Sequence, residues 1–302
     1  MRFFHSFWSK PMSDNHIAPS LVNYATSFAY AKQLGAEVVL HTDTRGAELL
    51  SAIPYDEVII DLNDIEERIT RFWAYGKLVA TQNEPIESIH IDGDVFLTSQ
   101  ALVPALEQNC DLLVQSEEDA SWRFDQSYQV SQYAISQYNL PEGLHIYHPN
   151  AYNCGLVRFN NPILKERYLN AYFDIVDYSL EDPMFTKRCE EHKGSHKGTV
   201  IPDLIAEQQV LHELAQGYDV KLLLPPPVNT NAHKMGYIHL LGKAKYIWWQ
   251  DVAAKLQEVS PVLYEDIMAS DTFRLYKQLL NDYGQKYVRA YAHQRRSRCD
   301  CH

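Results

Sequence analysis

The sequence predicts an α/β protein with one mixed, mainly parallel, Rossmann-like sheet flanked by helices and with further helices at its C-terminal end. Apolar strand patterns alternate with helical patterns in the first third of the chain, which is the order typical of a parallel sheet. An apolar stretch in mid-chain meets two carboxylates, and residues 248–293 have a helical pattern. We therefore expect one domain at residues 1–250 and a helical extension with a basic tail at residues 251–302.

In the first third of the chain, helices separate the predicted strands. Residues 18–34 carry a stripe of apolar side chains and end at Gly35, as an amphipathic helix does. Residues 64–81 give a second helix. The strands are predicted at residues 1–8, 37–41 and 58–62.

The remaining elements follow from the same patterns. Polar and aromatic side chains in residues 117–128 and 147–153 are typical of an open face. Residues 179–202 lack periodicity, so they form either a lid over a site or a plain solvated loop. Strands are predicted at residues 110–115, 155–159, 220–224 and 237–241, and helices at residues 101–108, 163–178, 204–214 and 248–293.

The composition is that of a globular protein and limits the classes of partner. Of the 302 residues, 46% are hydrophobic and 22% are charged, which allows a sizeable core. The net charge of −12 argues against a general nucleic-acid binder. The five cysteines lack a framework spacing, so reduced thiols are expected. No apolar run reaches the ~20 residues that span a bilayer, and no signal-peptide pattern is present, so we expect a cytoplasmic protein.

Residues 89–97 form the stretch around which the chain is organised. Apolar residues surround Asp92, Gly93 and Asp94, so two carboxylates end a buried strand. Like charges at such a place repel each other and resist desolvation unless a divalent cation lies between them and an anionic ligand. A nucleotide diphosphate is the expected ligand. The alternative is an ordinary turn, for which Asp-Gly-Asp is equally suitable.

Three later motifs, taken with this one, carry a family resemblance. Their order is Asn-x-Gly, then Glu-Gln-x-x-Leu, then His-x-x-Gly-x-x-Lys, and they begin at Asn153, Glu207 and His239. With the Asp-x-Asp motif, this order resembles that of family 8 glycosyltransferases, the group of glycogenin and the bacterial lipopolysaccharide galactosyltransferases. The resemblance implies the GT-A fold and a hexosyltransferase that uses a nucleotide diphosphate sugar, with a UDP-sugar expected.

The resemblance also implies a metal site. Asp92, Asp94 and His239 would hold Mn²⁺ or Mg²⁺, and the imidazole favours Mn²⁺. Gly242 would let the backbone approach a phosphate, and Lys245, with Lys243 beside it, would place positive charge on the departing diphosphate. Taken singly, a histidine of this kind is as well explained by a core position, and the lysines by a solvated face.

At the sugar end, the resemblance assigns Asn153 and Gly155 to donor binding, although a β-turn also explains Asn153. Glu207 and Gln208 would lie at the reacting face, where the family retains anomeric configuration. Glu207 replaces the family's Asp, and a longer carboxylate could act as a general base in an inverting reaction. A helix first turn rich in acids is the structural alternative.

Weaker signals place the nucleotide. Ser6 and Trp8 follow the first strand, Thr42 and Asp43 follow the second, and Lys77 lies on the helix before the acidic motif. All five are predicted to contact the donor. Core or capping roles are the alternatives for Trp8 and Thr42.

Three rival functions remain. A haloacid-dehalogenase phosphohydrolase also uses Asp-x-Asp, but at its first strand. A sugar nucleotidylyltransferase needs a Gly-rich loop after strand one, and a non-catalytic glycosyltransferase-like module differs only in activity. The expected partners are a nucleotide-sugar donor and a carbohydrate or glycoconjugate acceptor, with no nucleic acid and no transmembrane segment. The basic tail at residues 295–302 allows peripheral membrane contact, and its Cys299, Cys301 and His302 are too few for a structural zinc site.

Overall fold

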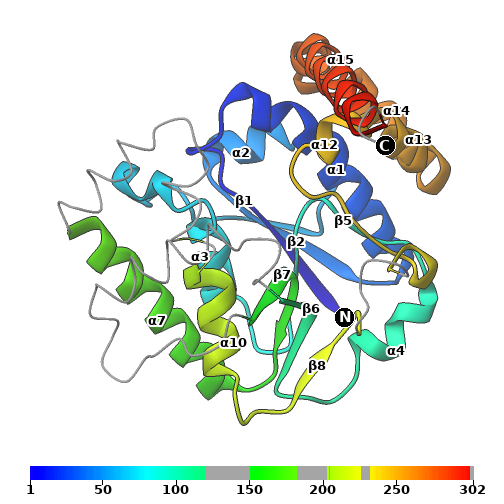
Figure 1. Cartoon of the computed structure of the whole chain (residues 1–302). Helices are drawn as coiled ribbons and strands as arrows, with labels where there is room; N and C mark the ends of the chain where they lie inside the picture. Colours follow the sequence, from blue (N-terminus) through cyan, green and yellow to red (C-terminus); the bar gives the residue numbers. More distant parts are fainter. Residues whose placement is uncertain (120–149, 182–202, 204, 226–231, 300–302) are drawn as a thin grey trace.

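A seven-stranded sheet forms the centre of the computed structural model, which describes residues 1–119, 150–181, 203, 205–225 and 232–299 (Figure 1). The strand order is β3-β2-β1-β4-β7-β6-β8. The strands are β1 (Arg2–Phe7), β2 (Glu37–Thr42), β3 (Glu57–Ile60), β4 (Ile89–Ile91), β6 (Leu112–Asp119), β7 (Asn150–Phe159) and β8 (Val220–Leu222). This mixed sheet confirms the predicted fold class.

The direction of the strands changes beside β4. Strands β1 to β4 pair in parallel, whereas β7 runs antiparallel to both β4 and β6, and β6 pairs in parallel with β8. The register of β4 and β7 places Ile91 opposite Leu156. The acidic turn that follows β4 therefore lies next to Gly155.

A second sheet has two strands, β5 (Val95–Leu97) and β9 (Tyr237–His239). They pair antiparallel, with Val95 opposite His239. Within residues 89–97, the sequence predicted a buried strand that stops at the two carboxylates, and β4 does stop there. The chain then leaves the large sheet, turns at Asp92–Asp94 and enters the small sheet as β5, which was not predicted as a separate strand.

Helices cover both faces of the large sheet. On one face, α1 (Asp14–Gln33) packs against the sheet and also contacts α13 (Trp249–Val259) and α15 (Asp271–Cys299). On the other, α3 (Tyr75–Asn83), α7 (Pro162–Glu181) and α10 (Val210–Leu214) enclose a second apolar cluster (Figure 1).

The C-terminal helices share the core of the sheet domain. Leu256 of α13, Ile267 of α14 (Pro261–Ala269) and Leu280 of α15 are fully buried in the same cluster as Phe3 and Val22. The predicted boundary at residue 250 stays a prediction.

Some elements differ from the predictions in type. The helix expected at residues 64–81 is a 3-10 segment, Glu67–Arg71, followed by α3, and the helix expected at 204–214 starts with a π-helical turn, Ile205–Gln209. After the strand predicted at residues 37–41, the structure has a short helix that was not predicted, α2 (Thr44–Leu49). The cause is Asp43, whose side chain accepts from the backbone N–H of Gly46 and caps the helix.

Other predictions concern residues that the structure does not describe. They are residues 182–202 of the predicted loop and residues 120–128 and 147–149 of the polar, aromatic segments. Helix α15 continues to Cys299, so the first part of the predicted tail is helical. The short helices α4 and α12 span Val103–Leu106 and Ala244–Ile247.

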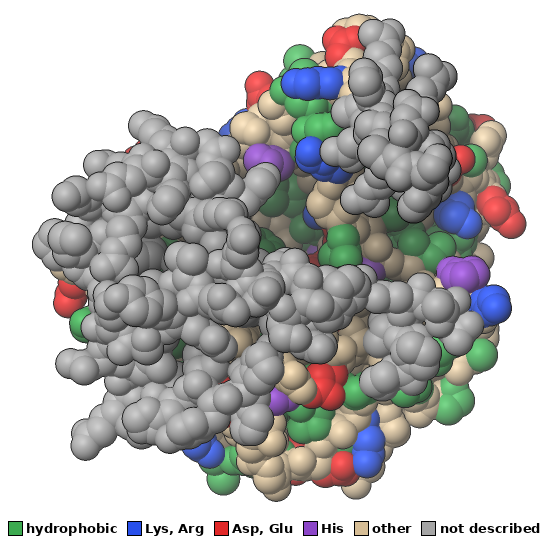
Figure 2. Space-filling model, viewed as in Figure 1, with side chains coloured by type: hydrophobic (Ala, Val, Ile, Leu, Met, Phe, Trp, Pro, Cys, Tyr) green, Lys and Arg blue, Asp and Glu red, His purple; other side chains and the backbone are tan. Residues whose placement is uncertain are grey.

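The surface carries charges of both signs (Figure 2), and two cysteines are buried. On the face in Figure 2, acidic and basic side chains of the described residues are interspersed. Cys110 and Cys154 are buried with free thiols. Among the described helices, none combines the length and apolar character needed to cross a membrane.

Candidate functional site

A cavity of about 330 Å³ lies beyond the carboxyl ends of β1 and β4. The strand order reverses between β1 and β4, and crevices beyond the carboxyl ends of strands at such a point are the usual ligand sites of open α/β sheets. Most residues predicted from the sequence line it: Ser6, Trp8, Lys77, Asp92, Gly93, Asp94, Asn153, Gly155, Glu207, Gln208, His239, Gly242 and Lys245.

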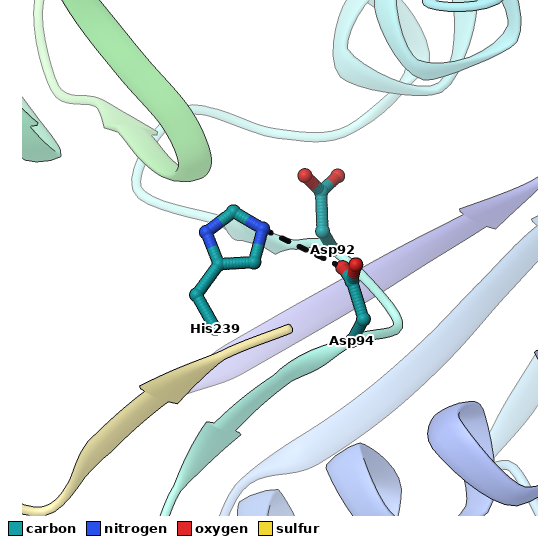
Figure 3. Close-up of side chains that lie close together, drawn as sticks. All are labelled: Asp92, Asp94 and His239. Atoms are coloured by element: carbon teal, nitrogen blue, oxygen red, sulfur yellow. Dashed lines mark ion pairs between the residues drawn. The ribbon is translucent and has the colours of Figure 1, made fainter. Parts of the chain in front are cut away.

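Asp92, Asp94 and His239 come together in this cavity. One ligand atom from each lies within 4.8 Å of the others. His239 Nε2 is 3.6 Å from Asp94 Oδ1, and Figure 3 shows the imidazole directed at that carboxylate. Pairing of β5 with β9 brings His239 there, since the N–H of Leu240 donates to the carbonyl of Asp94 at 3.0 Å.

The acidic turn is held by backbone bonds and by the absence of a side chain. The N–H of Asp92 donates to the carbonyl of Gly155 at 2.8 Å. A Cβ on Gly93 would lie 2.1 Å from the ring of Tyr24, whose hydroxyl donates to the carbonyl of Ser6 at 2.6 Å. Gly93 therefore allows α1 to pack directly beneath the turn.

Gln115 fixes the tautomer of His239. Its Oε1 only accepts, and it lies 2.9 Å from His239 Nδ1 and 2.7 Å from the hydroxyl of Tyr237. His239 Nδ1 must therefore carry a proton, which leaves the Nε2 lone pair of the neutral ring towards Asp94. A lone pair beside a carboxylate needs a proton or a cation between them. A metal-binding histidine has this arrangement, with its second nitrogen held by an acceptor.

Gly155 makes room for this arrangement. A Cβ there would lie 2.5 Å from Gln115 Oε1 and 2.6 Å from His239 Cε1. The sequence predicted that Gly155 leaves space for a sugar. In the structure, the space is used by the imidazole and by the carboxamide that orients it.

Lys77 is a buried cation that three acceptors share. Its Nζ lies 2.9 Å from Asp92 Oδ1, 2.6 Å from Glu207 Oε1 and 3.1 Å from the carbonyl of Cys154. Burial favours neutral Lys77, but the charges of Asp92 and Glu207 outweigh it and hold the lysine pKa above its usual value. Burial likewise opposes ionised Asp92, yet Lys77 holds the pKa of that carboxyl below its usual range.

Lys245 plays the corresponding part for Asp94. Its Nζ lies 2.7 Å from Asp94 Oδ2. Burial acts against the charge, but the carboxylate outweighs it, so the pKa of Lys245 is raised. Its side chain remains partly exposed, unlike that of Lys77.

These residues fit a divalent cation. Two carboxylates and one imidazole lone pair converge, and hard oxygen donors with one imidazole suit Mn²⁺ better than Mg²⁺. Each carboxylate already has an ammonium group beside it. Lys77 keeps Asp92 ionised, which is the form that binds a cation.

Glu207 lies at the deepest part of the site on the π-helical turn, and it is fully buried. Its Oε1 accepts from Lys77, while its Oε2 has no hydrogen-bond partner among the described residues. Burial raises the pKa of Glu207, and Lys77 only partly offsets this. The neighbouring Asp203 accepts from the N–H of Ala74 and from Tyr172, and burial with the charge of Glu207 raises its pKa to about 7.

Asn153 and Ser6 also line the cavity but have partners in the protein. Asn153 Nδ2 donates to Glu118 at 2.8 Å, and its Oδ1 accepts from the N–H of Gly155 at 3.0 Å. The hydroxyl of Ser6 lies 3.3 Å from His90 Nε2. Gly242 has a φ of +57°, a conformation that glycine adopts most readily.

Three predicted residues lie away from the cavity lining. Thr42 donates to the carbonyl of Phe7, and Asp43 caps α2 and accepts from Ser9, so both take the structural role. The ammonium of Lys243 lies 5.1 Å from the centre of the Tyr287 ring. Contact of these residues with a donor finds no support in the geometry.

Sequence reasoning missed several groups at the site. Gln115 orients His239, Tyr24 supports the acidic turn, and Asn23 and Glu118 line the cavity. Gln115 carried a readable signal, because it is a polar residue at the end of an apolar run. Asn23 and Tyr24 carried none, because they stand within an ordinary amphipathic helix.

Solved structures similar to this chain include two glycosyltransferases. One is mouse xyloside xylosyltransferase 1 in its apo form, with a TM-score of 0.36, 11% identity, and coverage of 73% of this chain and 84% of that chain. The other is the galactosyltransferase LgtC with donor and acceptor sugar analogues, with a TM-score of 0.43, 11% identity, and coverage of 91% and 100%. Likeness at this level does not assign a function.

A search of curated proteins gives no match to the sequence. The model of DUF6734, a family of unknown function, matches residues 1–270. The chain therefore belongs to the DUF6734 family.

Proposed function

We propose that this protein is a metal-dependent glycosyltransferase that moves a sugar from a nucleotide diphosphate sugar to a carbohydrate or glycoconjugate acceptor. A UDP-sugar is the first candidate for the donor. The observation that carries the proposal is the convergence of Asp92, Asp94 and His239, from distant parts of the chain, in a cavity that also holds Glu207 and Lys245.

In this proposal, Asp92, Asp94 and His239 hold the cation, with Mn²⁺ as the first candidate. The bound ion would neutralise the diphosphate and so make it a better leaving group. Gln115 keeps the ring of His239 in the tautomer that binds a metal. Gly93 and Gly155 contribute by allowing close packing around the ligands.

Lys245 is the proposed electrostatic catalyst. It lies beside Asp94 and is partly exposed to the cavity, so a rotation of its side chain can move its ammonium group onto a phosphate. Negative charge develops on the leaving diphosphate as the sugar–phosphate bond breaks. A positive charge there lowers the barrier to reaction.

Glu207 and Gln208 are proposed for the reacting face of the sugar. Lys77 holds one carboxylate oxygen of Glu207, and none of the described residues bonds the other. That oxygen could stabilise an oxocarbenium-like sugar in a retaining reaction, which the family resemblance favours, or could accept the acceptor's proton in an inverting one. The anomeric configuration of the product separates the two.

A ligand screen followed by a transfer assay tests the proposed function. Thermal unfolding is measured with UDP-sugars, GDP-sugars and related donors, each with and without Mn²⁺, because a bound ligand raises the melting temperature. We expect a Mn²⁺-dependent rise with one class of donor, and release of the nucleotide diphosphate when an acceptor sugar is added. A Mn²⁺-dependent rise without any turnover on an acceptor panel would favour the non-catalytic module.

The metal ligands provide the matched variants. Asp94→Asn should remain folded but lose the Mn²⁺-dependent rise, whereas Asp266→Asn, at an exposed position on α14, should retain it. If no donor raises the melting temperature with Mn²⁺, the proposal is wrong. Cytoplasmic location and peripheral membrane contact stay predictions from the sequence.

A further inference from the structure

Besides Glu207, two polar side chains in the cavity wall have atoms that form no hydrogen bond with a described residue. Asn23, on α1, is 2% exposed, and neither its Nδ2 nor its Oδ1 is bonded by a described residue. Trp8, just after β1, is 3% exposed, and its Nε1 is likewise unbonded. Buried polar groups are nearly always paired, because an unpaired one destabilises the folded state. Groups left unpaired in a cavity wall point to a ligand.

The neighbours of Asn23 on α1 show that it is exceptional within its helix. Tyr24 donates to the carbonyl of Ser6, Ser20 donates to the carbonyl of His16, and Thr26 donates to the carbonyl of Val22. Each therefore satisfies its hydroxyl within the protein. The carboxamide of Asn23 alone among these has both its donor and its acceptor free.

The chemistry of the free atoms limits the ligand. Trp8 Nε1 and Asn23 Nδ2 are donors, and a phosphate oxygen could accept from either. Asn23 Oδ1 only accepts, so it needs an N–H or O–H group. The diphosphate of a nucleotide sugar is esterified at both ends and fully ionised at neutral pH, so it has only acceptor oxygens and cannot provide one. The neutral part of a nucleotide sugar has such groups, both in its base and ribose and in its transferred sugar.

We propose that Asn23 and Trp8 form a subsite for the neutral, hydroxyl- or imide-bearing part of the donor. This inference rests on the proposed function, because it identifies the part of the nucleotide-sugar donor that the protein recognises. The acidic turn and Lys245 act on the diphosphate, whereas Asn23 and Trp8 distinguish a nucleotide sugar from other diphosphates.

Calorimetric titration tests the subsite with four probes: Mn²⁺ alone, pyrophosphate with Mn²⁺, UDP with Mn²⁺, and UDP-glucose with Mn²⁺. The variants are Asn23→Leu, which replaces the amide by an apolar side chain of similar shape, and Trp8→Phe, which removes the indole N–H. Thr26→Val is the control, because it removes a buried hydroxyl from the same helix away from the cavity.

We expect Asn23→Leu to weaken the binding of UDP or UDP-glucose by about tenfold or more, which corresponds to the loss of at least one good hydrogen bond. Mn²⁺ alone and pyrophosphate should bind as they do to the wild type. The melting temperature without ligand should stay the same or rise, because an unpaired buried amide has been removed. Trp8→Phe should weaken binding of the same probes, and Thr26→Val should leave the binding of every probe unchanged.

The probes also separate the two sources of the hydroxyl or imide group. Equal weakening of UDP and UDP-glucose assigns Asn23 to the nucleoside, while weakening of UDP-glucose alone assigns it to the sugar. Unchanged affinity for both in Asn23→Leu and Trp8→Phe overturns the subsite and leaves the proposed function standing. The subsite is also overturned if Asn23→Leu lowers the melting temperature and leaves the affinities unchanged, or if the variant no longer binds Mn²⁺ added alone. Wild-type protein that binds no nucleotide in the presence of Mn²⁺ overturns both proposals.

Discussion

Each carboxylate of the acidic turn is paired with a lysine, and the two lysines differ in how freely they can move. Lys77 is fully engaged, since Asp92, Glu207 and the carbonyl of Cys154 take its three protons. The sequence predicted that Lys77 reaches the donor. The geometry instead gives it a structural task, because a contact with a phosphate would break a buried ion pair. Lys245 has one partner and partial exposure, so it is the lysine free to move.

Lys245→Ala should lower kcat far more than it raises KM for the donor. The lysine charge matters most when the diphosphate leaves, so its removal affects the transition state more than the bound donor. Steady-state kinetics with varied donor concentration measure both quantities. If KM rises and kcat is unchanged, Lys245 is only a binding contact.

Gly155→Ala should reduce Mn²⁺ affinity although it changes no metal ligand. The added Cβ would meet Gln115 Oε1 and His239 Cε1 at 2.5 and 2.6 Å, so the imidazole must shift. We expect a loss of about 1–3 kcal/mol in stability from this overpacking. Titration with Mn²⁺ and urea unfolding measure the two effects. Wild-type Mn²⁺ affinity in the folded variant would show that His239 is no ligand.

At the residue scale, motif order predicted that Asp92, Asp94 and His239 converge, but not which residues support them. These three could be read because the ligand chemistry of a metal site, which we propose here, restricts residue type. Gln115 and Tyr24 act through contacts that exist only after folding, since Gln115 meets His239 from β6 and Tyr24 meets Gly93 from α1. Thr42 and Asp43 were predicted as donor contacts because they end a strand, but Thr42 donates to the carbonyl of Phe7 and Asp43 caps α2.

At the scale of elements, the strand and helix order was readable because apolar periodicity is local. The reversal at β7 was not, because pairing partners distant in the sequence decide it. The end of β4 at the two carboxylates was readable, but the assignment of the following apolar residues to a second sheet was not. Only the pairing of β5 with β9 separates the two strands.

The C-terminal helices give a prediction about elements. Ile267 of α14 is fully buried, and it lies in the same apolar cluster as residues of α1 and β1. Ile267→Ala should therefore destabilise the sheet domain itself by about 2–5 kcal/mol, as large-to-small changes in a core do. Urea unfolding followed by tryptophan fluorescence and circular dichroism should show one shifted transition.

A variant in which only a separate, low-stability transition shifted would indicate that residues 251–302 unfold independently. Val262→Ala is the control for this test. Val262 lies on the same helix but is 72% exposed, so its truncation should change stability little.

At the scale of the whole molecule, buried His5 should make the fold sensitive to acid. Burial lowers the pKa of His5 to about 3, while its ring bonds Tyr55 and Ser27. In the unfolded chain, a histidine titrates near 6.5. Between these values the unfolded state binds one more proton, so the contribution of His5 is complete above pH 6.5 and falls as pH falls towards 3.

His5→Gln should remove about 1.4 kcal/mol per pH unit from the slope of stability between pH 6 and pH 4, the value for one proton. Urea unfolding at several pH values measures the slope for the variant and the wild type. His233→Gln, at an exposed position, controls for the loss of a histidine. Parallel slopes for wild type and His5→Gln would contradict a neutral, buried His5.

The proposed function depends most on one metal ion bound by Asp92, Asp94 and His239. Electron spin echo spectroscopy of the protein with bound Mn²⁺ tests it directly, because a nitrogen ligand modulates the echo of the metal. We expect nitrogen modulation in the wild type and its loss in His239→Ala, with weaker Mn²⁺ binding in that variant. Bound Mn²⁺ without nitrogen modulation in the wild type, or the same modulation in His239→Ala, would contradict it.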